Sequence, residues 1–392
     1  MVQKVWHFFR DGFRKCDPIL LLLCIITTAF GCLMIASTTL YTEVGPTRYL
    51  LIQILATVLG VLFYVIFSSI DANFFAEHRM AMVIFNTFLL LLLIPFGVDI
   101  NGNKSWLDFP LLPFNIQPAE ICKITYILIM ASVMAAHQNN ISSISSVMHM
   151  VVHLGILVGM NMALSRDAGV SLIFVFIFIG MAFAGGVSLL WFLLAGGGIA
   201  VAFPILWNFL FDEYQQLRIK AIFDPSVDPL GIGVLHQTKG SLRSLTGGGM
   251  TGQGLFQGHR VQNGALFAQH TDFIYSAIGE ELGFVGCALV LVMFALIVWR
   301  IIRVGTRSQD YMRRLICFGA ASALIFQIVV NVAMCMGVGP VIGITLPFIS
   351  YGGSSIVTLY AMLGLVSGVH ARPAPASHER YIRAPYSLRT YH

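Results

Sequence analysis

Long stretches without a charged residue are the feature that most limits how this chain can fold. Residues 18–42, 49–70 and 80–98 contain none. A membrane helix needs about 17–25 mostly apolar residues, and each stretch meets that length. The chain as a whole is 57% hydrophobic and only 10% charged, whereas a soluble domain has about a quarter of its residues charged. The sequence therefore predicts an all-α, polytopic membrane protein.

Three longer uncharged stretches each contain a polar or Gly-rich patch, and each is expected to form two spans. They are 124–165, divided at HQNNISSISS (137–146); 168–211, divided at GGVS (185–188); and 315–371, divided at GVGPVIGITLPFISYGG. With one more at 282–299, about ten transmembrane helices are expected. The first is too long for the apolar region of a signal peptide and is expected to be retained.

The whole chain, residues 1–392, is therefore expected to be one integral membrane domain. Its spans cover about 18–370, a long loop at 212–272 separates helices seven and eight, and a flexible basic tail follows at 371–392. An even number of spans puts both termini on one side, and Lys and Arg residues indicate which. Fourteen of them fall on the side of the termini, against three in the short loops of the other side. We expect cytoplasmic termini, an extracytoplasmic 212–272 loop and a tail near the anionic inner leaflet.

The 212–272 loop is long for a connection inside a compact domain, and such loops are usually functional or disordered. It contains apolar residues, Asp-Pro turns and the run TGGGMTGQG (246–254). This run lacks the Lys-Ser/Thr of a P-loop. A flexible turn and an anion cradle of backbone N–H groups are both open interpretations.

Asp272 lies where this loop meets a long apolar segment, in AQHTDFIYSAIGEELGF (268–284). Asp and Thr are preferred helix caps, so Thr271 or Asp272 is expected to cap a helix beginning at Phe273. The alternative is a general base, because a carboxylate partly shielded from water has a raised pKa.

Glu280 and Glu281 follow on the same predicted helix, pointing about a right angle apart. They cannot both share the partner of Asp272. A carboxylate that faces lipid without a partner is costly, so at least one is expected inside the bundle, in a structural pairing.

Glu120 and Lys123 lie three residues apart near the outer end of span four, in FNIQPAEICKI. This spacing puts them on one helix face. They are expected either to form an ion pair or to line a polar cavity for a charged ligand. Asp167, in SRDAG, is expected to cap the next helix or to pair with Arg166 or Lys123.

The segment GVGPVIGITLPFISYGGSS (337–355) is uncharged and too irregular to face lipid, so it is expected to be buried or to line a cavity. Ser354 is expected either to cap the following helix or to line that cavity with Tyr351 and Ser355. The seven cysteines are scattered, mostly in apolar runs. They indicate neither a disulfide framework nor a metal site, and are expected to be apolar packing residues.

Taken together, these segments resemble the SEDS family of bacterial cell-wall polymerases (RodA, FtsW, SpoVE), from Asp17 to about Val369. The segments that carry the resemblance are FNIQPAEICK, FDPSVDPLGIG, SLRSLTGGGMTGQG, HTDFIYSAIGEELGF and TLPFISYGGSS. The chain departs from the family pattern at Ser105, at the 165–169 segment apart from its Asp167, at Gly240 and at Phe267. Phe326-Gln327 and Asn331 to Met334 lean toward the RodA branch.

The resemblance implies a peptidoglycan glycosyltransferase of the bacterial cytoplasmic membrane that polymerises lipid II at the outer face. It implies that Asp272 is the catalytic base and deprotonates the sugar 4-hydroxyl of an acceptor lipid II. The donor then loses a lipid pyrophosphate, whose charge basic residues offset. The implied substrate-binding residues are Lys123, Glu120, Trp106, Asp167, Arg218, Lys239, Arg243, His270 and Ser354.

The resemblance also implies a class B penicillin-binding protein as partner, besides lipid II and membrane lipids, and no nucleic acid. A divalent cation, Mg or Mn, is a possible cofactor, although no ligand cluster identifies one. Two other functions stay open: a lipid II flippase or transporter, and a non-catalytic scaffold of the cell-wall synthesis complex.

Overall fold

The computed structural model describes residues 16–42, 45–100, 103–109, 113–209, 213–228, 233, 235–266 and 268–372. Most of these residues are helical. The helices are α2 (Pro18–Thr38), α3 (Gly45–Ser69), α4 (Ala72–Glu77), α5 (Arg79–Leu91), α6 (Leu93–Phe96), α7 (Pro118–Ala136), η1 (Gln138–Asn140), α8 (Ile144–Ser165), α9 (Ala168–Ala184), α10 (Leu189–Phe209), α11 (Glu213–Phe223), η2 (Pro225–Val227), α12 (His236–Gly247), α13 (His259–Gln262), α14 (Ile274–Arg307), α15 (Tyr311–Cys335) and α16 (Gly353–Ala371). One antiparallel hairpin, β1 (Gly97–Ile100) and β2 (Asn103–Leu107), completes the described part.

The predicted spans correspond to ten apolar helices. In the described residues, eight are long and apolar enough to cross a membrane, and α9 and α10 supply shorter apolar stretches at Ala168–Ala184 and Leu189–Ile205. The chain breaks where the polar patches predict, because α7 ends at Ala136 before α8 begins, and α9 ends at Ala184 before α10 begins. The all-α polytopic fold is therefore confirmed. Most of the predicted tail, residues 373–392, lies outside the described residues.

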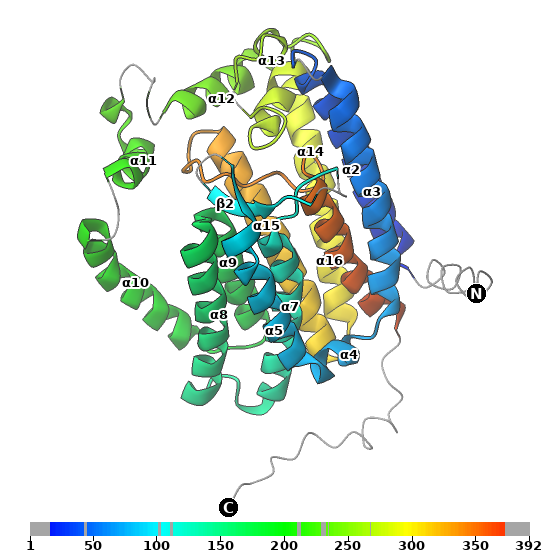
Figure 1. Cartoon of the computed structure of the whole chain (residues 1–392), viewed down its shortest axis with the longest axis vertical. Helices are drawn as coiled ribbons and strands as arrows, with labels where there is room; N and C mark the ends of the chain where they lie inside the picture. The colour runs from blue at the N-terminus through cyan, green and yellow to red at the C-terminus, as the bar shows by residue number, and fades with distance from the viewer. Residues whose placement is uncertain are drawn as a thin grey trace, which may run out of the picture.

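Helices α7, α15 and α16 form the most enclosed part of the bundle (Figure 1). α16 packs along α3, and α15 packs against α14, α9 and α7. The α3–α16 contact is close because Gly364 faces the backbone of Tyr64, where an added methyl carbon would lie 2.5 Å from the Tyr64 carbonyl oxygen. Small residues allow this approach of two membrane helices.

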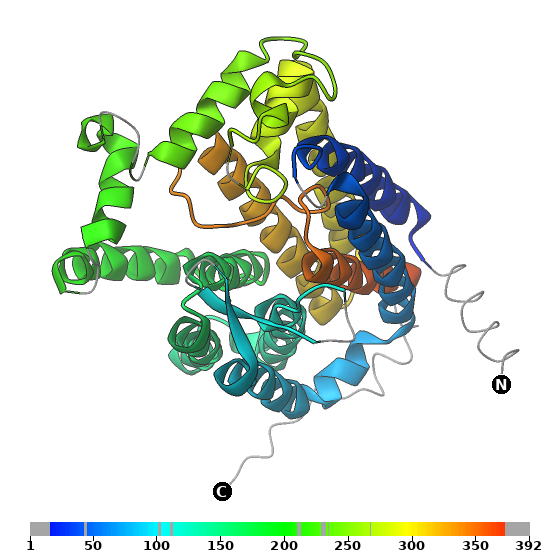
Figure 2. The same cartoon turned by 45° about the horizontal axis from the view of Figure 1, so that its top comes forward.

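The connection between α10 and α14 is folded in its described parts. Figures 1 and 2 show α10 and α11 standing away from the bundle, after which α12 returns to lie across the end of α14. Ser241 fixes α12 in place: its hydroxyl donates to the Cys335 carbonyl oxygen at 2.8 Å and lies 2.5 Å from the Ser276 hydroxyl. The loop thus reaches the helix that follows Asp272.

Helix α14 is interrupted at Gly283, whose φ of 65° lies outside the helical region. The Gly-rich run supplies the backbone partners that the interruption removes. Gln253 N and Gly254 N donate to the carbonyl oxygens of Glu280 and Glu281, at 2.9 and 3.0 Å. On the other side, Phe284 N and Val285 N donate to the carbonyl oxygens of Gly249 and Met250, at 2.9 and 3.1 Å. Of the two interpretations of this run, an anion cradle and a turn, the structure favours the turn, here bonded to a broken helix.

Glu280 and Glu281 hold the short helix α13 against this broken region. Both side chains are fully buried. Glu280 Oε1 accepts from the backbone N–H groups of Arg260 and Val261, at 2.5 and 3.3 Å. Glu281 Oε1 accepts from the Ser37 hydroxyl at 2.6 Å and from Gln262 Nε2 at 2.9 Å. The predicted structural pairing and the separate partners are both observed.

Candidate functional site

The backbone around Asp272 is clamped between α15 and the irregular 337–352 segment. Asn331 Nδ2 donates to the Asp272 carbonyl oxygen at 2.8 Å and to the Ile344 carbonyl oxygen at 2.7 Å. The Ser350 hydroxyl donates to the Thr271 carbonyl oxygen at 2.6 Å. The buried amide of Asn331 therefore fixes where the carboxylate stands.

The Asp272 side chain is not a helix cap. The N-cap position of α14 is Phe273, and no side chain makes a cap hydrogen bond there. The capping prediction for Thr271 or Asp272 is therefore wrong, because tertiary hydrogen bonds hold this turn instead. Asp272 is half-buried, and its carboxyl receives no hydrogen bond from the described residues.

Burial, together with the smaller effect of the nearby negative charge of Asp167, raises the pKa of the Asp272 carboxyl to about 6. A carboxylate with this pKa is mostly ionised at neutral pH and accepts a proton readily. The 337–352 segment passes beside it, since a methyl carbon on Gly343 would lie 3.9 Å from Asp272 Oδ2.

Asp167 begins the neighbouring helix α9. Its Oδ1 accepts from Val170 N at 3.0 Å, so the capping prediction is confirmed, and its Oδ2 accepts from Gln117 Nε2 at 2.9 Å. Burial and the nearby charge of Glu120 raise the pKa of Asp167, while the bond from Val170 N and the charge of Lys123 oppose the shift. No salt bridge joins Asp167 to Arg166 or Lys123 in the described residues, so the pairing alternative is not observed.

Glu120 and Lys123 form a buried ion pair at the start of α7. Lys123 Nζ lies 2.7 Å from Glu120 Oε1, and the two side chains are only 5–6% exposed. The Thr358 hydroxyl of α16 donates to Glu120 Oε2 at 3.0 Å. Of the two expectations for this pair, the ion pair is therefore the one observed.

Ser354 joins the starts of α7 and α16. The N-cap of α16 is Gly352, with no side-chain cap bond, so the capping alternative for Ser354 is wrong. Its hydroxyl instead accepts from Gln117 N at 3.2 Å. Gln117 thus connects two residues: its backbone N–H bonds to Ser354, and its side chain bonds to Asp167.

Trp106 lies on β2, beside the same helix ends. It pairs with Val98 across the hairpin and is half-buried. The preceding Ser105 donates its hydroxyl to the Ser165 carbonyl oxygen at 3.3 Å, two residues from Asp167. The hairpin therefore covers the end of α8 next to the carboxylates.

The remaining predicted site residues lie around this region with different surroundings. His270 is half-buried, with its ring 5.2 Å from Tyr49 and 5.9 Å from Tyr351, and burial lowers its pKa. Arg218 Nη1 donates to the Val341 carbonyl oxygen at 3.2 Å, which brings α11 to the 337–352 segment.

The two cations of α12 differ in their surroundings. Lys239 Nζ donates to the Asp228 carbonyl oxygen at 2.9 Å within the loop, whereas Arg243 is exposed.

Three connections of this site carry no signal in the sequence pattern that predicted the rest: Gln117 to Asp167, Thr358 to Glu120, and Asn331 to the Asp272 backbone. Each joins segments far apart in the chain. Among the described residues, no group of three or more His, Cys, Asp or Glu side chains is arranged to hold a metal ion.

Comparisons with known proteins agree with the resemblance in the sequence. The chain matches the family model FTSW_RODA_SPOVE, described as "Cell cycle protein", over residues 17–374. It is 31% identical over 369 residues to the "Probable peptidoglycan glycosyltransferase FtsW" of Thiomicrospira cyclica, covering 91% of this chain and 92% of that one. It is 30% identical over 357 residues to the "Peptidoglycan glycosyltransferase MrdB" of Escherichia coli K12, covering 90% and 93%.

Two solved structures share the fold. A chain from a study of "Structural coordination of polymerization and crosslinking by a peptidoglycan synthase complex" aligns with a TM-score of 0.76 and 29% identity, covering 91% of this chain and 97% of that chain. The Thermus thermophilus rod shape determining protein RodA aligns with a TM-score of 0.67 and 26% identity, covering 91% and 96%.

Proposed function

We propose a reaction for this site from the premise that the chain belongs to the SEDS family of FtsW, RodA and SpoVE proteins and is a peptidoglycan glycosyltransferase. Its substrate is lipid II, both as sugar donor and as acceptor. The relatives carry FtsW and MrdB names alike, so the RodA leaning from Phe326-Gln327 stays a prediction.

Asp272 is the general base of the proposed reaction. Its carboxylate takes the proton of the acceptor's sugar 4-hydroxyl, that oxygen attacks the donor's anomeric carbon, and the lipid pyrophosphate leaves. The observation that carries this assignment is the carboxylate of a half-buried residue next to the start of a membrane span, without a cap bond and with a pKa raised to about 6. A base needs a pKa near the working pH, which Asp272 has, and a side chain that is not committed to other partners; Asp272 is half-buried and no described residue donates to its carboxyl.

Arginines of α11 and α12, in the loop between α10 and α14, stabilise the leaving pyrophosphate in this proposal. Arg243 is exposed on α12, and Arg218 reaches the 337–352 segment beside Asp272. Lys123 is bonded to Glu120 in a buried pair. We therefore assign Lys123 and Glu120 to holding the start of α7 against α16, near Asp167, and Arg218 and Arg243 to offsetting the developing charge.

The proposed orientation puts Asp272 on the outer face, with both termini in the cytoplasm. The excess of Lys and Arg on the side of the termini supports it. A class B penicillin-binding protein is the proposed partner. The structural relative from a complex that couples polymerisation to crosslinking supports this pairing.

The test is an assay of the purified full-length protein in liposomes with labelled lipid II. Glycan polymer is the expected product. Movement of lipid II between leaflets without polymer would identify a flippase. If neither polymer nor movement is seen, with the transpeptidase partner present or absent, the protein would be a scaffold. Parallel reactions with EDTA, Mg²⁺ or Mn²⁺ test the divalent cation.

A further inference from the structure

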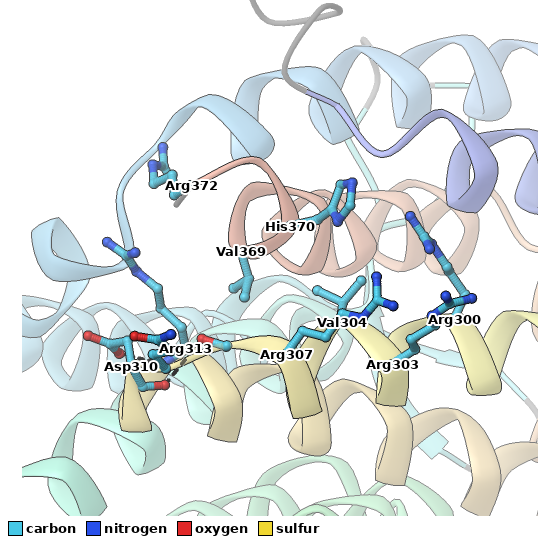
Figure 3. Close-up of a pocket in the computed structure, with 11 residues that line it drawn as sticks. Arg300, Arg303, Val304, Arg307, Asp310, Arg313, Val369, His370 and Arg372 are labelled. Carbon is cyan, nitrogen blue, oxygen red and sulfur yellow. Dashed lines mark hydrogen bonds between the residues drawn. The ribbon is translucent and has the colours of Figure 1, made fainter. Parts of the chain in front are cut away.

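A cavity of about 190 Å³, drawn in Figure 3, is lined by the last turns of α14. Asp272 precedes the other end of this helix. Its walls come from the end of α14, the turn to α15, the start of α15 and the end of α16. The lining residues are Arg300, Arg303, Val304, Arg307, Ser308, Gln309, Asp310, Arg313, Val369, His370 and Arg372. About 24 residues of helix separate Gly283 from Arg307, a rise of roughly 36 Å, so the cavity and Asp272 lie at opposite membrane faces.

The cavity carries excess positive charge. Five arginines line it, and the carboxylates that contact or line it within the described residues are Asp17, Asp71 and Asp310. Asp17 is committed to Arg300, at 2.7 and 3.0 Å. Asp71 is shared by Arg313 and Arg372, at 3.3 and 3.8 Å. About two positive charges are left without a matching carboxylate.

Among the described residues, two guanidiniums and one buried N–H group of this lining have no acceptor. Within the described part of the chain, no salt bridge involves Arg303 or Arg307, and the Arg303 guanidinium lies over the Trp299 ring at 4.9 Å. Arg313 is only 8% exposed, yet its Nε has no hydrogen-bond partner. A buried N–H without an acceptor costs free energy, so a bound acceptor would relieve it.

A single arginine near the end of a membrane helix often only extends its charged group to the lipid headgroups. Here arginines from α14, α15 and the end of α16 line a single cavity. A simple excess of positive charge at one membrane face would not need them to meet in one place. The volume has room for roughly a dozen waters, or for one phosphate group with its ester substituents. The planar fork of a guanidinium matches phosphate oxygens in pairs.

We infer that this cavity binds the phosphate of an anionic phospholipid headgroup at the membrane face opposite Asp272. The lipid is favoured over a soluble phosphate because the lining helices are membrane spans that end there, where headgroups are concentrated. The assignment is independent of the proposed polymerase activity, and it holds for either orientation of the chain.

The test uses the purified full-length protein in detergent and native mass spectrometry, with phosphatidylglycerol, phosphatidylcholine and inorganic phosphate as separate probes. The paired variant Arg303→Gln/Arg307→Gln removes two guanidiniums that pair with no carboxylate of the described residues. Arg79→Gln, at the start of α5 and outside the cavity, is the matched control. Thermal unfolding of each variant checks that the fold is kept.

Phosphatidylglycerol is expected to bind the wild type and Arg79→Gln alike, and the paired variant at least about tenfold more weakly. Phosphatidylcholine is expected to bind all three equally. Equal phosphatidylglycerol binding by the paired variant and the wild type would overturn the site. Binding of inorganic phosphate that is lost in the paired variant, with no preference for phosphatidylglycerol, would overturn the lipid assignment.

Discussion

The charge of Asp167 acts on Asp272, although the two carboxylates belong to different segments at the ends of α9 and α14. Ile342 of the 337–352 segment lies against Gly169, and Gly343 lies beside Asp272. A helix cap on one side of this segment therefore influences the proton affinity of the proposed base on the other.

The first prediction concerns the pH dependence of polymerisation. Because Asp272 must be ionised to act as a base and its pKa is about 6, kcat/KM should fall about tenfold per pH unit below that value. Asp167→Asn removes a negative charge that raises this pKa, so the acid limb should move to lower pH. Asn caps about as well as Asp, so α9 should stay intact. An acid limb that does not move between the two proteins would contradict the coupling.

The second prediction concerns Asp272→Asn. The amide cannot accept the proton, and the native side chain makes no cap bond whose loss would unfold α14. Polymerisation should therefore fall by about 10²–10⁴-fold with an unchanged melting temperature. Asp108→Asn, which changes an exposed carboxylate after β2, is the matched control and should keep wild-type activity. Wild-type turnover in Asp272→Asn would end the base assignment.

The third prediction separates the two roles considered for Lys123. Lys123→Met leaves the Glu120 carboxylate buried without its cation, which should cost about 3–5 kcal/mol of stability. Adding Glu120→Gln should restore most of that loss, measured as the melting temperature. If Lys123 holds the site together, the double variant should also regain activity. Restored stability with activity still absent would assign Lys123 a direct contact with substrate.

The fourth prediction concerns the ion pair between Arg300 and Asp17. Asp17 is fully buried and its two oxygens both bond to Arg300. Arg300→Gln should therefore lower stability by about 3–5 kcal/mol. Arg303→Gln, one turn along the same helix and without a carboxylate partner in the described part of the chain, should change stability by less than about 1 kcal/mol. Similar melting temperatures for the two variants would show that the buried pair adds little.

The spans could be predicted from the sequence because charge-free length is a local property, and so could the i,i+3 pairing of Glu120 with Lys123. The interpretation of Asp272 as a helix cap is wrong. Asn331 and Ser350, which lie in other segments, bond to the backbone of this turn and hold it in place. Arg300 and Asp17, 283 residues apart, give no local sign of their contact. Pairings of this kind depend on how the helices pack against each other, and the pattern of apolar and polar residues along one helix does not determine that packing.

The break at Gly283 gives α14 two parts with different attachments. The Gly-rich run is bonded to both parts, and the short part that follows Asp272 is bonded in addition to α13 and to α12. Asp272 therefore lies between the folded loop that is bonded to this short part and Asn331 of α15, which bonds to its backbone.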